Sequence, residues 1–150
     1  GGHAPGLVNT IDYVTLATTG NAIDFGDMTE TGDRSRANSD GLRAIIARGQ
    51  QADTSQFNNM DFIYIATKGN TADFGDMTVT ASMRNGFSDS IRGGWCHGYG
   101  APAFNNTNVI ESFQFATRGD CVDFGDVTSG ASREGVGGMS EGHGGLTHGL

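Results

Sequence analysis

The sequence predicts an all-β protein, and three observations support this prediction. One stretch occurs three times, at 17–29, 66–78 and 116–128, with spacings of 49 and 50 residues. Apolar and polar residues alternate in the segment before each copy, which is typical of a half-buried strand. The chain also contains 25 Gly and only 2 Pro, which favours many tight turns over helices. We therefore expect three units of about 50 residues, each a four-stranded antiparallel sheet.

The first strand of each unit is predicted just before and into the repeated stretch. The three predicted strands are 11–17, 60–66 and 110–116. Each is followed by a pair of residues that favours positive φ and therefore a tight hairpin turn. These pairs are Gly20-Asn21, Gly69-Asn70 and Gly119-Asp120.

The second strand of each unit carries a Phe that we expect to anchor the core: Phe25, Phe74 and Phe124. An aliphatic residue or Met follows three positions later, where strict alternation would place it on the opposite face. A β-bulge at the intervening Gly would return both side chains to one face.

The third and fourth strands are expected in the more polar remainder of each unit. A short strand is predicted at 36–39, and a further strand at 43–49, with equivalents at 92–98 and 143–149.

The chain begins and ends in the middle of a unit. We predict one repeat domain over 1–150, with internal repeats at 34–83 and 84–132 and a split repeat made of 1–33 and 133–150. A split unit exposes strand edges at both termini, and such edges seek a partner. The termini could pair within one chain to give a three-sheet prism. Two chains could instead form a six-bladed ring, or successive chains could form a filament.

Charge and composition exclude several classes of function. The net charge is −8 and Lys68 is the only Lys, so the chain lacks the basic patch that nucleic acids or anionic membranes require. No apolar run approaches the length of a membrane span, and no signal peptide is recognisable. Cys96 and Cys121 are too few for a disulfide framework. They could form one disulfide, but we expect two free thiols.

The repeated stretch also carries two resemblances. The first resemblance is to a kelch-type β-propeller blade. It is carried by the apolar strand Asp61-Phe62-Ile63, the pair Phe74 and Met77, Arg84, and the pair Gly93-Gly94. The closer resemblance is to the tandem GNAxDFGD repeats of phage virion and tail proteins, especially cyanophage-like ones. It is carried by Gly20-Asn21-Ala22 with 24–27, and by Gly69-Asn70 with 73–76. This second resemblance implies a structural or receptor-facing part of a virion.

Two kinds of site are predicted beside the structural anchors. Paired aspartates could bind a structural Ca²⁺, which takes oxygen ligands, although short Asp side chains also cap turns. These are Asp24, Asp27, Asp73, Asp76, Asp123 and Asp126. Aromatic residues beside Gly-rich loops could contact a surface glycan or simply pack between sheets. These are Trp95, Tyr99 and Phe104.

These observations predict a non-enzymatic structural or assembly protein, with a lectin-like or receptor-binding module as the alternative. No nucleophile motif is present, and three near-equivalent units give little reason to expect a catalytic cleft. No cofactor is expected beyond a structural Ca²⁺. We expect a homo-oligomer or a virion assembly formed through the split-repeat termini, located in a virion or outside the cell.

Overall fold

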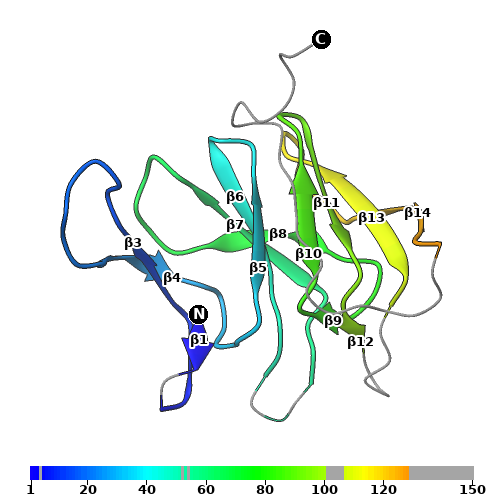
Figure 1. Cartoon of the computed structure of the whole chain (residues 1–150), viewed down its shortest axis with the longest axis horizontal. Helices are drawn as coiled ribbons and strands as arrows, with labels where there is room; N and C mark the ends of the chain where they lie inside the picture. Colours follow the sequence, from blue (N-terminus) through cyan, green and yellow to red (C-terminus); the bar gives the residue numbers. More distant parts are fainter. Residues whose placement is uncertain (4, 52, 54, 101–106, 129–150) are drawn as a thin grey trace.

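The computed structural model describes residues 1–3, 5–51, 53, 55–100 and 107–128. The described part is all-β and contains no helix, and therefore no helix that could cross a membrane. Its strands form several small antiparallel sheets (Figure 1). The predicted all-β class is confirmed.

Two sheets have four strands each, connected in chain order. The first contains β5 (Arg36–Ser39), β6 (Arg43–Ala47), β7 (Asn59–Tyr64) and β8 (Ala72–Asp76). The second contains β10 (Asn85–Ser88), β11 (Arg92–Cys96), β13 (Val109–Gln114) and β14 (Val122–Asp126). The strands predicted at 36–39, 43–49 and 92–98 are therefore found, whereas 143–149 lies outside the described residues.

The remaining strands form smaller sheets. β3 (Thr10–Tyr13) pairs with β4 (Ile23–Asp27), and these two strands correspond to β7 and β8 in the repeated sequence. Two further pairs were not predicted, because two-residue strands leave no periodicity to read. They are β1 (Gly2–His3) with β2 (Leu7–Val8), and β9 (Ala81–Ser82) with β12 (Tyr99–Gly100).

The predicted β-bulge is present in each copy of the repeated stretch. Met60 lies opposite Gly75 while Asp61 lies opposite Asp73, so Phe74 is the additional residue in β8. The same register shift occurs in β4 and β14. As expected, the bulge places Phe74 and Met77 on one face, and each is only 3% exposed.

The hairpin turn was predicted at the wrong residues. Between β7 and β8 the tight turn is closed by Thr67 N–H, which donates to Tyr64 O at 3.2 Å. The equivalent bond between β3 and β4 joins Thr18 N–H to Thr15 O at 3.2 Å. Gly69-Asn70 lies beyond the turn, which leaves its backbone groups available for another sheet.

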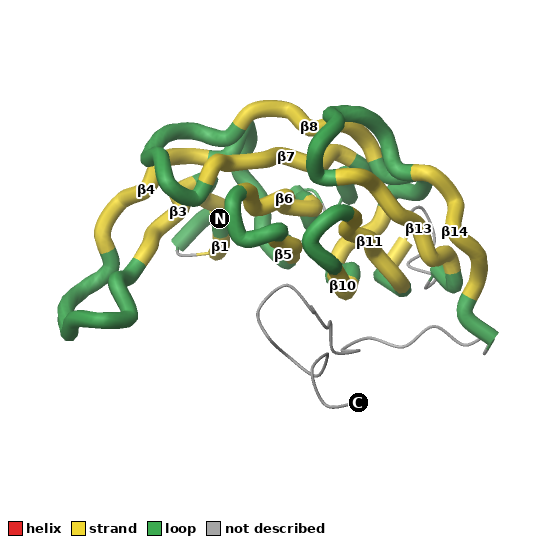
Figure 2. The backbone as a smooth tube through the Cα atoms, turned by 90° about the horizontal axis from the view of Figure 1, so that it is seen from above, coloured by secondary structure: helices red, strands yellow, loops and turns green. Residues whose placement is uncertain are grey.

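The core lies between the two four-stranded sheets. It joins mainly aromatic residues and Met from β7, β8, β11 and β13, among them Met60, Phe62, Phe74, Trp95 and Phe113. β5 and β10 lie side by side, and Asn38 Nδ2 donates to Gly94 O at 2.8 Å across the sheets. Seen from above, the described strands follow an open arc, with β3 and β4 at one end and β14 at the other (Figure 2).

Candidate interface between sheets

The first junction along the arc is a short backbone ladder between β4 and the segment before β8. Gly69 N–H donates to Phe25 O at 2.9 Å, and Thr71 N–H donates to Asp27 O at 2.8 Å. The side chain of Asn70 completes the ladder, because its Oδ1 accepts from Asp27 N–H at 3.0 Å. We call 69–71 a docking segment and 25–27 the edge segment that it meets.

The second junction has the same bonds between the next pair of copies. Gly119 N–H donates to Phe74 O at 2.9 Å, and Cys121 N–H donates to Asp76 O at 2.8 Å. Asp120 takes the place of the Asn, and its Oδ1 accepts from Asp76 N–H at 3.0 Å. The docking segment 119–121 therefore meets the edge segment 74–76 just as 69–71 meets 25–27.

Gly26 and Gly75 are required at these junctions. Their φ angles are 151° and 149°, a region that residues with a Cβ rarely adopt. A Cβ on Gly26 would lie 2.3 Å from Gly69 O, and a Cβ on Gly75 would lie 2.3 Å from Gly119 O. The Gly of each Asp-Phe-Gly-Asp sequence thus permits the close approach of the next docking segment.

An acidic side chain provides a second connection at the first junction. Asp61 lies in β7, is 2% exposed, and accepts from Thr29 N–H at 3.1 Å and from Thr29 Oγ1 at 2.9 Å. Thr71 Oγ1 also donates to Asp61 Oδ2 at 2.9 Å. This buried carboxylate therefore ties Thr29, two residues beyond β4, to the next sheet, and its hydrogen bonds offset the cost of its burial.

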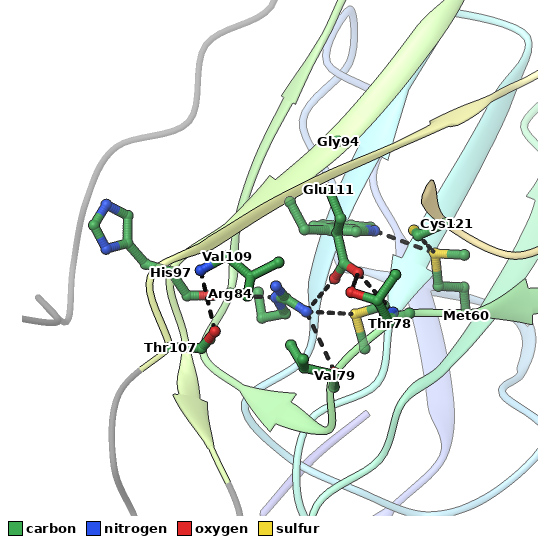
Figure 3. Close-up of polar contacts among 12 residues, drawn as sticks. Met60, Thr78, Val79, Arg84, Gly94, His97, Thr107, Val109, Glu111 and Cys121 are labelled. Atoms are coloured by element: carbon green, nitrogen blue, oxygen red, sulfur yellow. Dashed lines mark hydrogen bonds and ion pairs between the residues drawn. The ribbon is translucent and has the colours of Figure 1, made fainter. Parts of the chain in front are cut away.

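At the second junction Glu111 takes the role of Asp61. Its carboxylate accepts from the N–H and hydroxyl of Thr78, and it forms a buried ion pair with Arg84 (Figure 3). Arg84 is 1% exposed and Glu111 is 0% exposed. Burial lowers the pKa of Arg84, and the charge of Glu111 acts in the opposite direction. Arg84 also donates from Nε to His97 O at 3.1 Å and from Nη1 to Val79 O at 3.4 Å, so one guanidinium joins two loops to the junction.

Both cysteines are free thiols, as predicted. Cys121 is buried, and its Sγ lies 3.6 Å from Met60 Sδ. Burial raises the pKa of the Cys121 thiol well above its ordinary value. A buried neutral thiol is a packing group rather than a nucleophile.

The paired aspartates do not converge with a third acid. Within the described residues, no group of three or more His, Cys, Asp or Glu side chains is placed to hold a metal ion. Asp61, the nearby acid, is occupied by Thr29 and Thr71. Burial, together with the charges of Asp120 and Asp73, raises the pKa of Asp76.

Two of the three aromatic residues predicted as glycan contacts, Trp95 and Tyr99, lie within the described residues. Trp95 is 0% exposed and its Nε1–H donates to Met60 Sδ at 3.2 Å, so its ring is unavailable for stacking on a sugar. Tyr99 is half-buried in β12, and Phe104 lies outside the described residues.

The three Phe residues predicted as core anchors lie in different environments. Phe74 is a core residue, and its ring packs edge-on against Phe62 and Phe113. Phe25 is half-buried beside Tyr13. Phe124 is 65% exposed and is therefore not a core residue, because no further sheet covers β14 in the described structure.

Sequence reasoning did not predict the buried acids or the docking segments. A signal was present, since an acidic residue stands at the same place in each copy: Asp12, Asp61 and Glu111. A polar residue repeated inside an otherwise apolar strand indicates a buried hydrogen-bonding role. No family model and no curated protein matches this sequence.

Proposed function

We propose that this chain is a non-enzymatic structural protein whose repeated stretches join successive β-sheet units into a larger assembly. The most direct support is that the repeated residues form hydrogen bonds between neighbouring sheets. In both junctions these residues are the Gly-Asn or Gly-Asp pair, the Asp-Phe-Gly-Asp sequence and the Thr that follows it.

In the proposed architecture each four-stranded sheet is one kelch-like unit, and β3 with β4 belongs to a unit that is incomplete. The internal units correspond to 34–83 and 84–132. The described strands form an open arc (Figure 2), which favours continuation by another molecule over a self-closed prism. Six units from two molecules would complete a ring, and a different angle between molecules would give a filament.

On the resemblance to the phage repeats, we propose that the assembly is part of a virion, as a fibre, tail or capsid-decorating module. An acidic surface suits a particle component that must not bind nucleic acid indiscriminately. The lectin-like alternative is less well supported, because its central ring, Trp95, is buried.

The assembly proposal is tested by light scattering on a sizing column, at low and physiological salt, with and without Ca²⁺. We expect particles heavier than the 15.6 kDa chain. A 15.6 kDa species at every concentration would contradict the assembly proposal. Loss of assembly in chelator would assign the aspartate pairs to cation binding.

The virion assignment needs its own test. Mass spectrometry of purified virus particles should recover peptides of this chain in amounts comparable to known structural proteins. Recovery only from the soluble fraction of infected cells would contradict it.

A further inference from the structure

The two ends of the arc carry unfilled halves of the junction that occurs twice inside it. At one end, residues 20–22 correspond to a docking segment, and all three are exposed. At the other end, residues 124–126 correspond to an edge segment, and β14 pairs with β13 only. Neither half has a hydrogen-bond partner of the junction type among the described residues.

Side-chain burial shows what each half lacks. Phe74 is 3% exposed where the next docking segment and sheet cover it, whereas the equivalent Phe124 is 65% exposed. Thr71 and Cys121 are 8% and 6% exposed in filled junctions, whereas the equivalent Ala22 is exposed. The unfilled ends thus leave apolar surface in water that the internal junctions bury.

The acid and the Thr of the junction are also present, one at each end. Asp12 corresponds to Asp61 and Glu111, and it is exposed on β3. Thr128 corresponds to Thr29 and Thr78, and it is exposed after β14. The acid and the Thr that hydrogen-bond to each other at the internal junctions are therefore both present at the ends, the acid on β3 and the Thr after β14.

A cation–π contact present at both internal junctions, Lys68 with Tyr13 and Arg118 with Phe62, has no equivalent between the two ends. Arg118 lines a hollow formed in part by Phe62, Lys68 and Ala72, with its guanidinium 4.4 Å from the Phe62 ring. The equivalent hollow on the last sheet is lined by Ser112, Arg118 and Val122, without a residue from a following sheet. The residue that corresponds to Arg118 in a following unit is Thr19, a smaller side chain.

We propose that a second molecule of this chain fills the junction, with its 20–22 segment docked on residues 124–126 of the first. This inference rests on the proposed assembly function and specifies its surfaces. Gly20 N–H would donate to Phe124 O, and Ala22 N–H would donate to Asp126 O. Asn21 Oδ1 would accept from Asp126 N–H, and Asp12 would accept from Thr128.

Docking requires a change at Gly20. In filled junctions Gly69 and Gly119 have φ angles of 146° and 152°. Gly20 is outside the positive-φ region, and a Cβ built on it meets no atom within 4 Å. Gly can move between these conformations at little cost, whereas Ala cannot. An Ala at position 20 therefore suits the free molecule and opposes the docked one.

The contact is heterologous, because it joins one end of a molecule to the opposite end of the next. Such contacts produce closed rings or open filaments, according to the angle between successive molecules. Charge repulsion at this contact is weaker than at the second internal junction, since neutral Asn21 takes the place of the acidic Asp120. The net charge of −8 still opposes association, so we expect association to strengthen with salt.

The test compares the sedimentation of the unmodified chain with Gly20→Ala over a range of concentrations. We expect the unmodified chain to associate and Gly20→Ala to weaken association at least tenfold, with unchanged thermal unfolding of the dilute protein. Asn21→Asp should retain association, because Asp120 forms the same bond internally. Asn21→Ala should weaken association about fivefold, as expected for one lost hydrogen bond.

The outcomes separate the two proposals. Association that persists unchanged in Gly20→Ala and Asn21→Ala would overturn this interface while leaving an assembly function in place. A monomeric unmodified chain at all concentrations and salt levels would overturn both.

Discussion

At the scale of single residues, position 75 requires Gly for two reasons, its backbone conformation and the lack of space for a Cβ, and an experiment can separate them. Its φ of 149° disfavours any other residue, and Gly119 O leaves no space for a Cβ. Gly125 has a similar φ of 145°, but a Cβ there would meet no atom within 4 Å.

We therefore expect Gly125→Ala to lower the free energy of unfolding by about 1–2 kcal/mol, from backbone strain alone. Gly75→Ala should lower it by about 4 kcal/mol, because it also disrupts the second junction. Urea unfolding of the dilute protein measures both values. Equal costs for the two substitutions would contradict the role of Gly75 in the junction.

The buried pair of Arg84 and Glu111 gives a second prediction. Glu111→Gln should lower the free energy of unfolding by about 3–5 kcal/mol, because it leaves the Arg84 charge buried without its partner. Replacing both residues, Arg84→Met with Glu111→Leu, should recover part of this loss. A control is Arg92→Gln, which removes a largely exposed partner of Asp89 and should cost less than about 1 kcal/mol. A loss at Glu111 no larger than the control would contradict the account.

Asp76 predicts a pH dependence. Because the folded state raises the pKa of this acid, chiefly by burial, its charged form destabilises the fold. Asp76→Asn should therefore increase stability at neutral pH. The gain should shrink as the pH falls through the raised pKa, and vanish below the ordinary value of 3.8, where the native Asp76 is protonated in both states. Thermal unfolding across this pH range measures the difference. A gain that grew toward acid would have the wrong sign.

The residue scale is also where sequence reasoning was weakest. The bulge at the Gly was predictable, because Phe74 and Met77 are three apart and must share a face. The partner of Arg84 was not predictable, since the structure aligns Arg84 with Ser35, which carries no charge, and aligns Arg34 with Met83. Such choices depend on side-chain length and loop path, which a single sequence does not specify.

At the scale of elements, the apolar pattern indicated where β3, β7 and β13 lie, although β7 buries three consecutive residues and not a single face. The predicted strand at 36–39 has the same bounds as β5. The role of Gly69-Asn70 was misjudged, since a Gly-Asn pair suits both a tight turn and an extended docking segment. Only the neighbouring edge segment decides between them.

Two acidic side chains stabilise turns within a sheet and, among the described residues, take no part in the hydrogen bonds between sheets. Asp40 accepts from the backbone N–H of Leu42 and Arg43 in the turn between β5 and β6. Its burial raises its pKa, but the hydrogen bonds from Arg43 and Leu42 outweigh this effect and lower the pKa overall. Asp89 performs the same task between β10 and β11. The acidic composition therefore reflects structural tasks in turns and junctions as well as surface charge.

At the scale of the whole molecule, the sheets are connected by backbone ladders at the convex side and by side-by-side β5 and β10 at the concave side (Figure 2). The periodicity of the sequence predicted three units of about 50 residues, and the described strands form two four-stranded and three two-stranded sheets. It did not predict that the described strands would form an open arc, because closure depends on the angle between successive sheets. That angle results from side-chain packing at each junction.

The central claim is that docking segments join sheets, twice within the chain and once between molecules. Amide hydrogen exchange tests it most directly, since a hydrogen-bonded N–H exchanges slowly. In dilute protein, the amides of Gly69, Thr71, Gly119 and Cys121 should be protected, while those of Gly20 and Ala22 should exchange freely. At concentrations that favour association, Gly20 and Ala22 should become protected as well. Rapid exchange at Gly69 and Gly119, or no concentration dependence at Gly20 in associated protein, would contradict the account.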